Sequence, residues 1–419
     1  MAMYRKLVLD NGMRVVTECM PGLKSVTIGI WVNVGSRDEQ PGEEGLSHFL
    51  EHMFFKGTRS RSAVQIAREI DALGGEMNAF TTRETTTFYV KVLDQQLKPA
   101  LALLADLFHR SRFDAREVDK EKQVVLEEIR MVQDDPEDLA QELHAGQALR
   151  RHPLGRSILG TPGTIRKVSR RDLLRYVSDH YQPSQTVIAA AGNVNFKEFS
   201  GLLERYFGSS LTRQQASPNR WPAEIRGGLL VRRKRLEQAH LCLGLKGVEH
   251  AHKDRYAAHA LNTVLGGSVS SRLFQEIREK RGLAYSIYSY LSSYSDGGTF
   301  SIYAATRPGE ASRVIDLICR EIRRLCRGGI GRHELLRAKN QMKGTLMLSM
   351  ESSHSRMGKL AKDELSHGRL ISLEEILSEI DRVSVDAVLR LSQDLFDMSR
   401  LSVTALGPVS RESLASALS

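Results

Sequence analysis

Two histidines and a glutamate within five residues constrain this chain more than any other feature of its sequence. They are His48, Glu51 and His52, in the run HFLEH. Residues four apart in an α-helix are rotated by only about 40°, so the two imidazoles project side by side, and Glu51 flanks the same face. The run therefore predicts a helix that presents two metal-binding imidazoles and a carboxylate together. The alternative is a pair of surface histidines on an amphipathic helix, which chance yields in roughly a few of every hundred chains of this length.

The length of the chain predicts two domains. Its 419 residues exceed the usual limit for a single hydrophobic core. Residues 209–222 carry Ser, Gln, Pro and Asn without periodicity, which is typical of a linker. We therefore expect a first domain over residues 1–210, a linker over 211–225 and a second domain over 226–419.

Segments typical of strands and helices alternate in both halves of the chain. Shifting the sequence by 210 residues aligns the tripeptide KGT at 56–58 with GGS at 266–268, and the same order of elements then recurs. At this offset the three residues of the motif fall on Ala258, Leu261 and Asn262. The second half is therefore predicted to be a related domain that lacks the metal residues. The expected fold class is α+β, with two related domains, each a mostly antiparallel sheet backed by helices.

Composition narrows the class of protein. A formal charge of +10 is compatible with nucleic-acid binding, but the basic residues are dispersed and no nucleic-acid-binding motif is present, so we expect no nucleic-acid partner. The four cysteines form no C-x-x-C pair, which favours reduced thiols in an intracellular protein. No segment has the pattern of a signal peptide, and no apolar run approaches the roughly 18 residues of a membrane span. We therefore expect a cytoplasmic protein with no membrane partner; an organellar protein that has lost its leader is the lesser alternative.

Two histidines do not complete a catalytic zinc site, which needs three protein ligands and an open position for water. A long helical segment that begins near Asp114 offers Glu121, Glu127 and Glu128. Glu121 and Glu128 are seven residues apart and share a helix face, whereas Glu127 points about 100° away from Glu128, toward solvent. Taken alone, these residues also fit an ordinary charged face of a solvated helix.

The arrangement H-x-x-E-H is that of the inverted zinc peptidases, and the chain resembles the pitrilysin/insulinase family of zinc peptidases. The resemblance is closest to the catalytic β subunit of mitochondrial processing peptidase and its bacterial relatives. It spans most of the chain, and its segments are HFLEHMFFKGT (48–58), NAFT (78–81), HPLG (152–155), GTP (160–162), LGG (265–267) and SRLF (271–274). Gly163 and Ser268-Val269 depart from the residues common in relatives, which leaves the substrate preference open.

The resemblance implies a complete zinc site. In the family, the third ligand is a glutamate 76 positions after the second histidine, and counting from His52 gives Glu128. A carboxylate one helical repeat earlier supports the site, and Glu121 occupies that position. One zinc ion per chain is then expected on His48, His52 and Glu128, where it would activate water, with Glu51 as the general base.

The second half matches the family at an arginine and a tyrosine in the spacing R-x6-Y, which are Arg278 and Tyr285. Family members project these two side chains into the active site from their second domain. The resemblance implies that Arg278 grips a substrate carbonyl and that Tyr285 donates to the developing oxyanion. The alternative is an arginine at a helix end and a tyrosine that begins a core strand.

The family also binds extended peptides at a sheet edge near the zinc. The corresponding residues here are Asn78, Ala79, Phe80 and Thr81. A plain buried strand is the alternative.

The resemblance predicts a zinc endopeptidase that cleaves unfolded peptides or leader segments, with one chain forming half of a clamshell chamber. Family members of this length pair two chains, so we expect a homodimer, in which Arg278 and Tyr285 serve either their own zinc site or that of the partner. The rival is a structural or substrate-binding subunit of a hetero-oligomeric processing peptidase. Intact His48, Glu51, His52 and Glu128 argue against that rival, because such subunits usually lack these residues.

Overall fold

The computed structural model describes residues 3–209 and 218–416, so residues 211–217 of the expected linker lie outside the described residues. By their contacts the chain forms two compact units. Unit 1 comprises the residues up to 130 together with 156–220 and 349–370. Unit 2 comprises residues 131–155, 221–348 and 371 onward.

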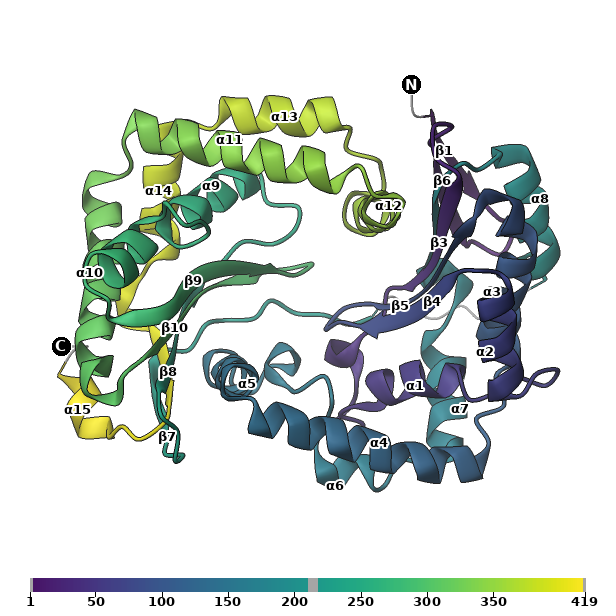
Figure 1. The fold of residues 1–419 in the computed structure, drawn as a ribbon, viewed down its shortest axis with the longest axis horizontal. Helices are drawn as coiled ribbons and strands as arrows, with labels where there is room; N and C mark the ends of the chain where they lie inside the picture. The colour runs from purple at the N-terminus through teal and green to yellow at the C-terminus, as the bar shows by residue number, and fades with distance from the viewer. Residues whose placement is uncertain (1–2, 210–217, 417–419) are drawn as a thin grey trace. The chain divides into compact units, whose positions relative to one another are not determined.

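Unit 1 is built on a mixed sheet whose strand order is β1-β2-β6-β3-β5-β4 (Figure 1). Neighbouring strands pair antiparallel except β2 and β6, which are parallel. β4 therefore lies at one edge of this sheet. The strands are β1 (Met3–Val8), β2 (Arg14–Cys19), β3 (Ser25–Val32), β4 (Glu76–Thr81), β5 (Thr86–Leu93) and β6 (Thr186–Gly192).

Strand alternation gives the sheet of unit 1 two apolar faces. Ile28 and Ile30 of β3 face one core, which also contains Phe49 and Leu50, whereas Trp31 faces a second core. Helices from the first half of the chain lie on the side of the sheet that Ile28 and Ile30 face. They are α1 (Leu46–Phe54), α2 (Ala63–Ala72), α3 (Leu97–Arg110), α4 (Ala115–Asp134), α6 (Pro162–Ile165), α7 (Arg170–His180) and α8 (Phe196–Phe207). The second face is covered by α12 (Ser353–His367), which comes from the other half of the chain.

Unit 2 has a sheet in the order β7-β11-β8-β10-β9, with β7 and β11 as its parallel pair (Figure 1). Its strands are β7 (Gly228–Arg232), β8 (Ala239–Lys246), β9 (Ala284–Ser293), β10 (Gly298–Thr306) and β11 (Ser402–Leu406). Its larger core is formed with helices α9 (Arg255–Leu265), α10 (Ala311–Gly328), α11 (Arg332–Ser349), α14 (Val385–Leu395) and α15 (Arg411–Ala415). Helix α13 (Leu373–Arg382) packs against α9. A short π-helix spans Phe274–Glu279. The opposite face of the sheet packs against α5 (Pro136–Ala148).

The predicted internal repeat is confirmed by the topology. Strands β2, β6, β3, β5 and β4 of unit 1 correspond in order and direction to β7, β11, β8, β10 and β9 of unit 2. Helix α9 takes the place of α1, and its Ala258 and Leu261 are fully buried in the core where α1 carries His48 and Glu51. The counterpart of His52 is Asn262, whose side chain accepts a hydrogen bond from Ser289 at 2.7 Å, so none of the three positions carries a metal-binding histidine or carboxylate in unit 2.

The two halves exchange one helix each. Helix α5 follows α4 in sequence but packs on the sheet of unit 2, and α12 follows α11 but packs on the sheet of unit 1. The expected division into contiguous halves did not include this exchange. Its consequence is that the chain passes from unit 1 to unit 2 at residues 130 and 131, within α4 itself.

The structure describes all four cysteines of the chain. Cys19, Cys242, Cys319 and Cys326, all within the described part of the chain, are free thiols. Among the described helices, none combines the length and the apolar character that a membrane span requires.

Candidate metal centre

Helix α1 divides its residues between the core and a polar neighbour. Phe49, Leu50 and Met53 are buried in the core of unit 1. The 3.6-residue period therefore turns His48 and His52 to another side, where α4 lies. Both imidazoles are largely buried, with side-chain exposures of 12% and 17%.

The side chains of His48, His52 and Glu128 converge on one point. The Nε2 atoms of the two histidines are 3.3 Å apart. Glu128 Oε2 lies 3.5 Å from His48 Nε2 and 3.4 Å from His52 Nε2. This trio is the one group of three metal-binding side chains found in the described portion of the chain. The structure thus brings together the three residues that the sequence predicts as ligands.

This triangle fits a tetrahedral zinc ion. Zn–N and Zn–O bonds of about 2.0–2.2 Å with tetrahedral angles separate the ligand atoms by about 3.3–3.5 Å. The measured separations of 3.3, 3.4 and 3.5 Å match that requirement. Glu128 Oε2 is buried and has no hydrogen-bond partner. A buried carboxylate oxygen normally has a partner, and a metal ion between these three atoms would supply it.

His48 is held in the neutral form that metal binding requires. Burial, helped by the proximity of His52, lowers the pKa of His48 to about 4. A neutral imidazole offers a lone pair to a metal, whereas an imidazolium offers none. The environment of His48 therefore favours the ligand form throughout the neutral pH range.

His52 is oriented by an outer pair of charged residues. Glu121 Oε1 lies 2.8 Å from His52 Nδ1, and Lys56 Nζ lies 2.7 Å from Glu121 Oε2. Burial alone would raise the pKa of Glu121, but the hydrogen bonds from His52 and Lys56 outweigh it and lower that pKa. A carboxylate on Nδ1 leaves Nε2 free for a metal, as in many carboxylate–histidine–metal arrangements.

The sequence predicted Glu121 but missed Lys56. Lys56 lies four residues after His52, just beyond the end of α1, and this spacing is the signal that would have found it. Glu127, by contrast, points to solvent as expected, with a side chain 61% exposed and 2.5 Å from Arg130.

The carboxylate of Glu51 is partly buried. Its Oε2 atom is buried and has no hydrogen-bond partner. Burial raises the pKa of Glu51, and hydrogen bonds from the side chain and backbone of Thr81 oppose that shift. A carboxyl group whose pKa is raised toward neutrality is a more effective proton acceptor and donor at the pH of the cell.

The predicted substrate strand is β4, and Thr81 is its last residue. Because β4 pairs only with β5 among the described strands, its other edge is not covered by a strand. Asn78 is exposed, Ala79 is buried in the core, and Phe80 packs edge-on against Trp31 at 5.5 Å. The edge that such a strand presents thus ends beside Glu51.

Arg278 and Tyr285 belong to unit 2, where they are neighbours. The Arg278 guanidinium lies 4.7 Å from the centre of the Phe274 ring and 5.4 Å from that of Tyr285. Tyr285 is 76% exposed. Tyr285 is the second residue of β9, and its side chain points away from the core that Ala284 and Ile287 of the same strand enter.

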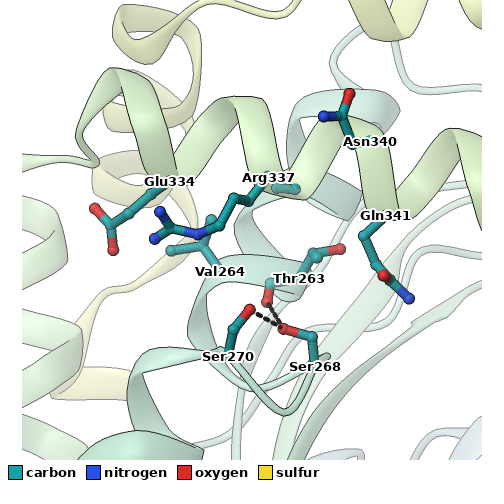
Figure 2. Close-up of a pocket in the computed structure, with 9 residues that line it drawn as sticks. Thr263, Val264, Ser268, Ser270, Glu334, Arg337, Asn340 and Gln341 are labelled. Carbon is teal, nitrogen blue, oxygen red and sulfur yellow. Dashed lines mark hydrogen bonds between the residues drawn. The ribbon is translucent and has the colours of Figure 1, made fainter.

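A pocket lies within unit 2, between helix α11 and the end of α9 with the loop that follows it. Figure 2 shows its hydroxyl, amide and guanidinium groups. It has a volume of about 370 Å³. The residues that line it are Thr263, Val264, Ser268, Ser270, Glu334, Arg337, Ala338, Asn340 and Gln341. Its lining contains neither histidine nor cysteine, unlike the candidate metal centre of unit 1.

Comparison with protein families matches both halves of the chain. Residues 14–162 match the model described as "Insulinase (Peptidase family M16)". Residues 167–342 match the model described as "Peptidase M16 inactive domain".

Curated relatives are similar over almost the whole chain. A protein of Bacillus subtilis (strain 168) named "uncharacterized zinc protease YmxG" is 45% identical over 394 residues, which cover 94% of this chain and 96% of that protein. An "uncharacterized zinc protease" of Mycobacterium leprae (strain TN) is 41% identical over 407 residues, covering 96% and 91%.

Two solved structures share the fold with a TM-score of 0.91 each. A protease from Helicobacter pylori is 25% identical, and the match covers 97% of this chain and all of that one. A peptidase M16 inactive domain from Pseudomonas fluorescens is 20% identical, covering 97% and 98%, and this second likeness shows the fold alone.

Proposed function

Because this chain belongs to the insulinase family of zinc peptidases, we propose that it is a zinc-dependent endopeptidase that hydrolyses unfolded peptides or leader segments. The observation that carries the proposal is the triangle of donor atoms from His48, His52 and Glu128, with separations of 3.3–3.5 Å. Three protein ligands that leave a fourth position open are the arrangement of a catalytic rather than a structural zinc site.

The proposal gives each residue of the site a role. His48, His52 and Glu128 would hold one zinc ion per chain, and Glu121 would keep His52 in the tautomer that offers Nε2. When bound there, zinc would lower the pKa of a water molecule to about 7 and polarise the scissile carbonyl.

Glu51 acts as the general base and then as the general acid. It takes a proton from the attacking water and delivers it to the amine that leaves. Its buried, unpartnered Oε2 supports this role, because that atom is available to a proton and its raised pKa suits both directions of transfer.

Arg278 and Tyr285 serve the substrate in this proposal. Arg278 grips a substrate carbonyl, and the Tyr285 hydroxyl donates to the oxygen on which negative charge develops. The 76% exposure of Tyr285 supports a role toward a ligand rather than in the core. The pair serves either the metal centre of its own chain or that of a partner. Mixing Tyr285→Phe chains with Glu51→Gln chains distinguishes the two arrangements.

The edge strand β4 provides a site for extended peptides. A peptide that pairs with residues 78–81 gains backbone hydrogen bonds that do not depend on its sequence. Because Thr81 bonds to Glu51, a peptide running along this edge would present its backbone to the general base.

We further propose a cytoplasmic homodimer whose chains each supply half of a peptide-enclosing chamber. The alternative function is a structural or substrate-binding subunit, and one observation favours it: residues 167–342 match a model described as an inactive domain. That match lies wholly outside the metal residues, and unit 1 retains all three ligands and the base.

The test combines metal content with cleavage of a quenched fluorescent peptide library, for the native chain and for Glu51→Gln. The proposal predicts about one zinc per chain in both proteins, cleavage by the native chain that a chelator abolishes, and a loss of at least about 100-fold in Glu51→Gln. A native chain that binds zinc but cleaves no peptide without a second, co-purifying chain would support the subunit alternative. Absence of both zinc and cleavage would refute the peptidase.

A further inference from the structure

The N-terminus of α1 is capped by a residue outside the helix. The N-cap position is Gly45, which has a φ of 93° and no side chain that could accept a hydrogen bond. Glu39 supplies the acceptors instead. The Gly45 N–H donates to Glu39 Oε2 at 2.9 Å, and the Ser47 N–H donates to Glu39 Oε1 at 2.7 Å.

Glu39 is buried, and neighbouring arginines hold the loop around it. The residue is 3% exposed, and Arg156 Nη1 donates to its backbone carbonyl at 2.8 Å. The preceding residue, Asp38, is held by Arg220, whose Nε and Nη2 atoms lie 2.9 and 2.8 Å from its carboxylate oxygens. Hydrogen bonds to the backbone of Glu39 and to the side chain of Asp38 therefore hold this loop in place.

The capped turn is the one that carries the metal residues. Helix α1 has nine residues, and helices of this length are marginal unless their ends and faces are fixed by other contacts. Ser47 directly precedes His48, so the amide that Glu39 holds is one residue from a ligand. A frayed first turn would move His48 relative to His52 and Glu128.

We propose that Glu39 is a positioning residue for the metal centre, which holds the first turn of α1 so that His48 keeps its place in the ligand triangle. This inference rests on the proposed zinc function. The Glu39 carboxylate accepts hydrogen bonds from Gly45 and Ser47 and from none of His48, His52 and Glu128, so it acts on the metal centre through α1. Burial raises the pKa of Glu39 to about 8, and the hydrogen bonds from Ser47 and Gly45 oppose that shift.

Three variants of the full chain test the proposal. Glu39→Ala removes both acceptors, whereas Glu39→Gln keeps the shape and one acceptor oxygen, so the isosteric variant stays informative if the alanine variant does not fold. Glu84→Gln is the matched control. Glu84 is also a buried carboxylate beside this loop, and it accepts a hydrogen bond from Arg37 Nη1 at 2.7 Å, whereas the amides of Gly45 and Ser47 donate to Glu39.

The measurements are the dissociation constant of zinc, by competition with a chromophoric chelator, and the visible absorption spectrum of the cobalt(II)-loaded proteins. The melting temperature of each metal-free protein records the purely structural cost. We expect zinc binding to weaken about 10–100-fold in Glu39→Ala and by less in Glu39→Gln, with an altered cobalt spectrum in both. In Glu84→Gln we expect a lower melting temperature with unchanged zinc affinity and cobalt spectrum.

Three other outcomes would overturn the positioning role of Glu39 or the proposed zinc function. Native zinc affinity and an unchanged cobalt spectrum in both Glu39 variants would overturn the positioning role while the zinc function stands. Equal weakening in the Glu39 and Glu84 variants would also overturn it, since the effect would then follow general stability. A native chain that binds no zinc would refute the proposed function, and the inference with it.

Discussion

Lys56 offers a sharp test of how this chain orients a metal ligand. Its ammonium group lies 2.7 Å from Glu121 Oε2, and Glu121 Oε1 lies 2.8 Å from His52 Nδ1. Glu121 is 3% exposed, so its negative charge depends on nearby partners. Once His52 binds a metal as a neutral imidazole, Lys56 provides the positive charge beside this carboxylate. Replacing Lys56 by methionine removes that charge and keeps most of the side-chain volume.

The expected loss follows from the geometry. Removing an outer partner of a metal-binding histidine costs about 10–100-fold in metal affinity, which corresponds to about 1.4–2.7 kcal/mol. The side chain of Lys56 is 32% exposed, so water replaces part of its interaction with Glu121. We therefore expect Lys56→Met to weaken zinc binding about tenfold, at the lower end of that range.

A competition titration with a chromophoric chelator measures this loss, and two variants control it. Lys56→Arg keeps the charge and should retain most of the affinity. Lys120→Met removes an exposed lysine of α4 that lies 2.6 Å from Glu117, and it should leave zinc binding unchanged. If Lys56→Met binds zinc as tightly as Lys120→Met, then the contact between Lys56 and Glu121 does not support His52, and the reasoning is refuted.

Three further predictions concern other parts of the molecule. Tyr285→Phe should lower kcat about 100-fold or more with unchanged zinc content. Mixing Tyr285→Phe chains with Glu51→Gln chains then shows which metal centre Tyr285 serves. Recovered cleavage places Tyr285 at the metal centre of the partner chain, and no recovery places it at that of its own chain. His144, whose pKa burial lowers to about 4, binds fewer protons in the folded than in the unfolded chain between pH 6.5 and 4. Stability should therefore fall with falling pH, by about 2 kcal/mol from this residue between pH 7 and 5, and a urea titration of His144→Gln that keeps the same slope would exclude this cause. Gly244→Ala would place a methyl group 2.3 Å from His144 Nε2, so the free energy of unfolding of this variant should be lower by about 1–3 kcal/mol. A variant with the same midpoint of urea denaturation as the native chain would contradict the close packing of Gly244 against His144.

Much of the local structure and part of the metal centre were predictable because they depend on short-range geometry. The sequence pattern predicts helices over about residues 62–73, about 96–111 and 170–180, and the structure has α2 at 63–72, α3 at 97–110 and α7 at 170–180. His48 and His52 meet because a helix places residues four apart on one side. Glu121 and Glu128 share a face of α4 for the same reason, although their contact with α1 was inferred from a family resemblance rather than from the residues themselves.

The remaining features depend on contacts between segments that no local pattern connects. The exchange of α5 and α12 escaped prediction because an amphipathic helix indicates that it covers a sheet, but does not indicate which sheet. Glu39 is an ordinary acidic residue in the sequence, and only the fold turns it toward the amides of Gly45 and Ser47.

The sequence by itself determined the two-domain organisation, the order of the elements and the pair of imidazoles on α1, because periodicity and helix geometry act within a few residues of each other. Only the tertiary structure decided which carboxylates meet these imidazoles, which lysine balances them and which side chain caps the helix. Those choices are made by packing over separations of 69 residues for Glu121 and 76 for Glu128, where side-chain directions follow from the arrangement of whole helices.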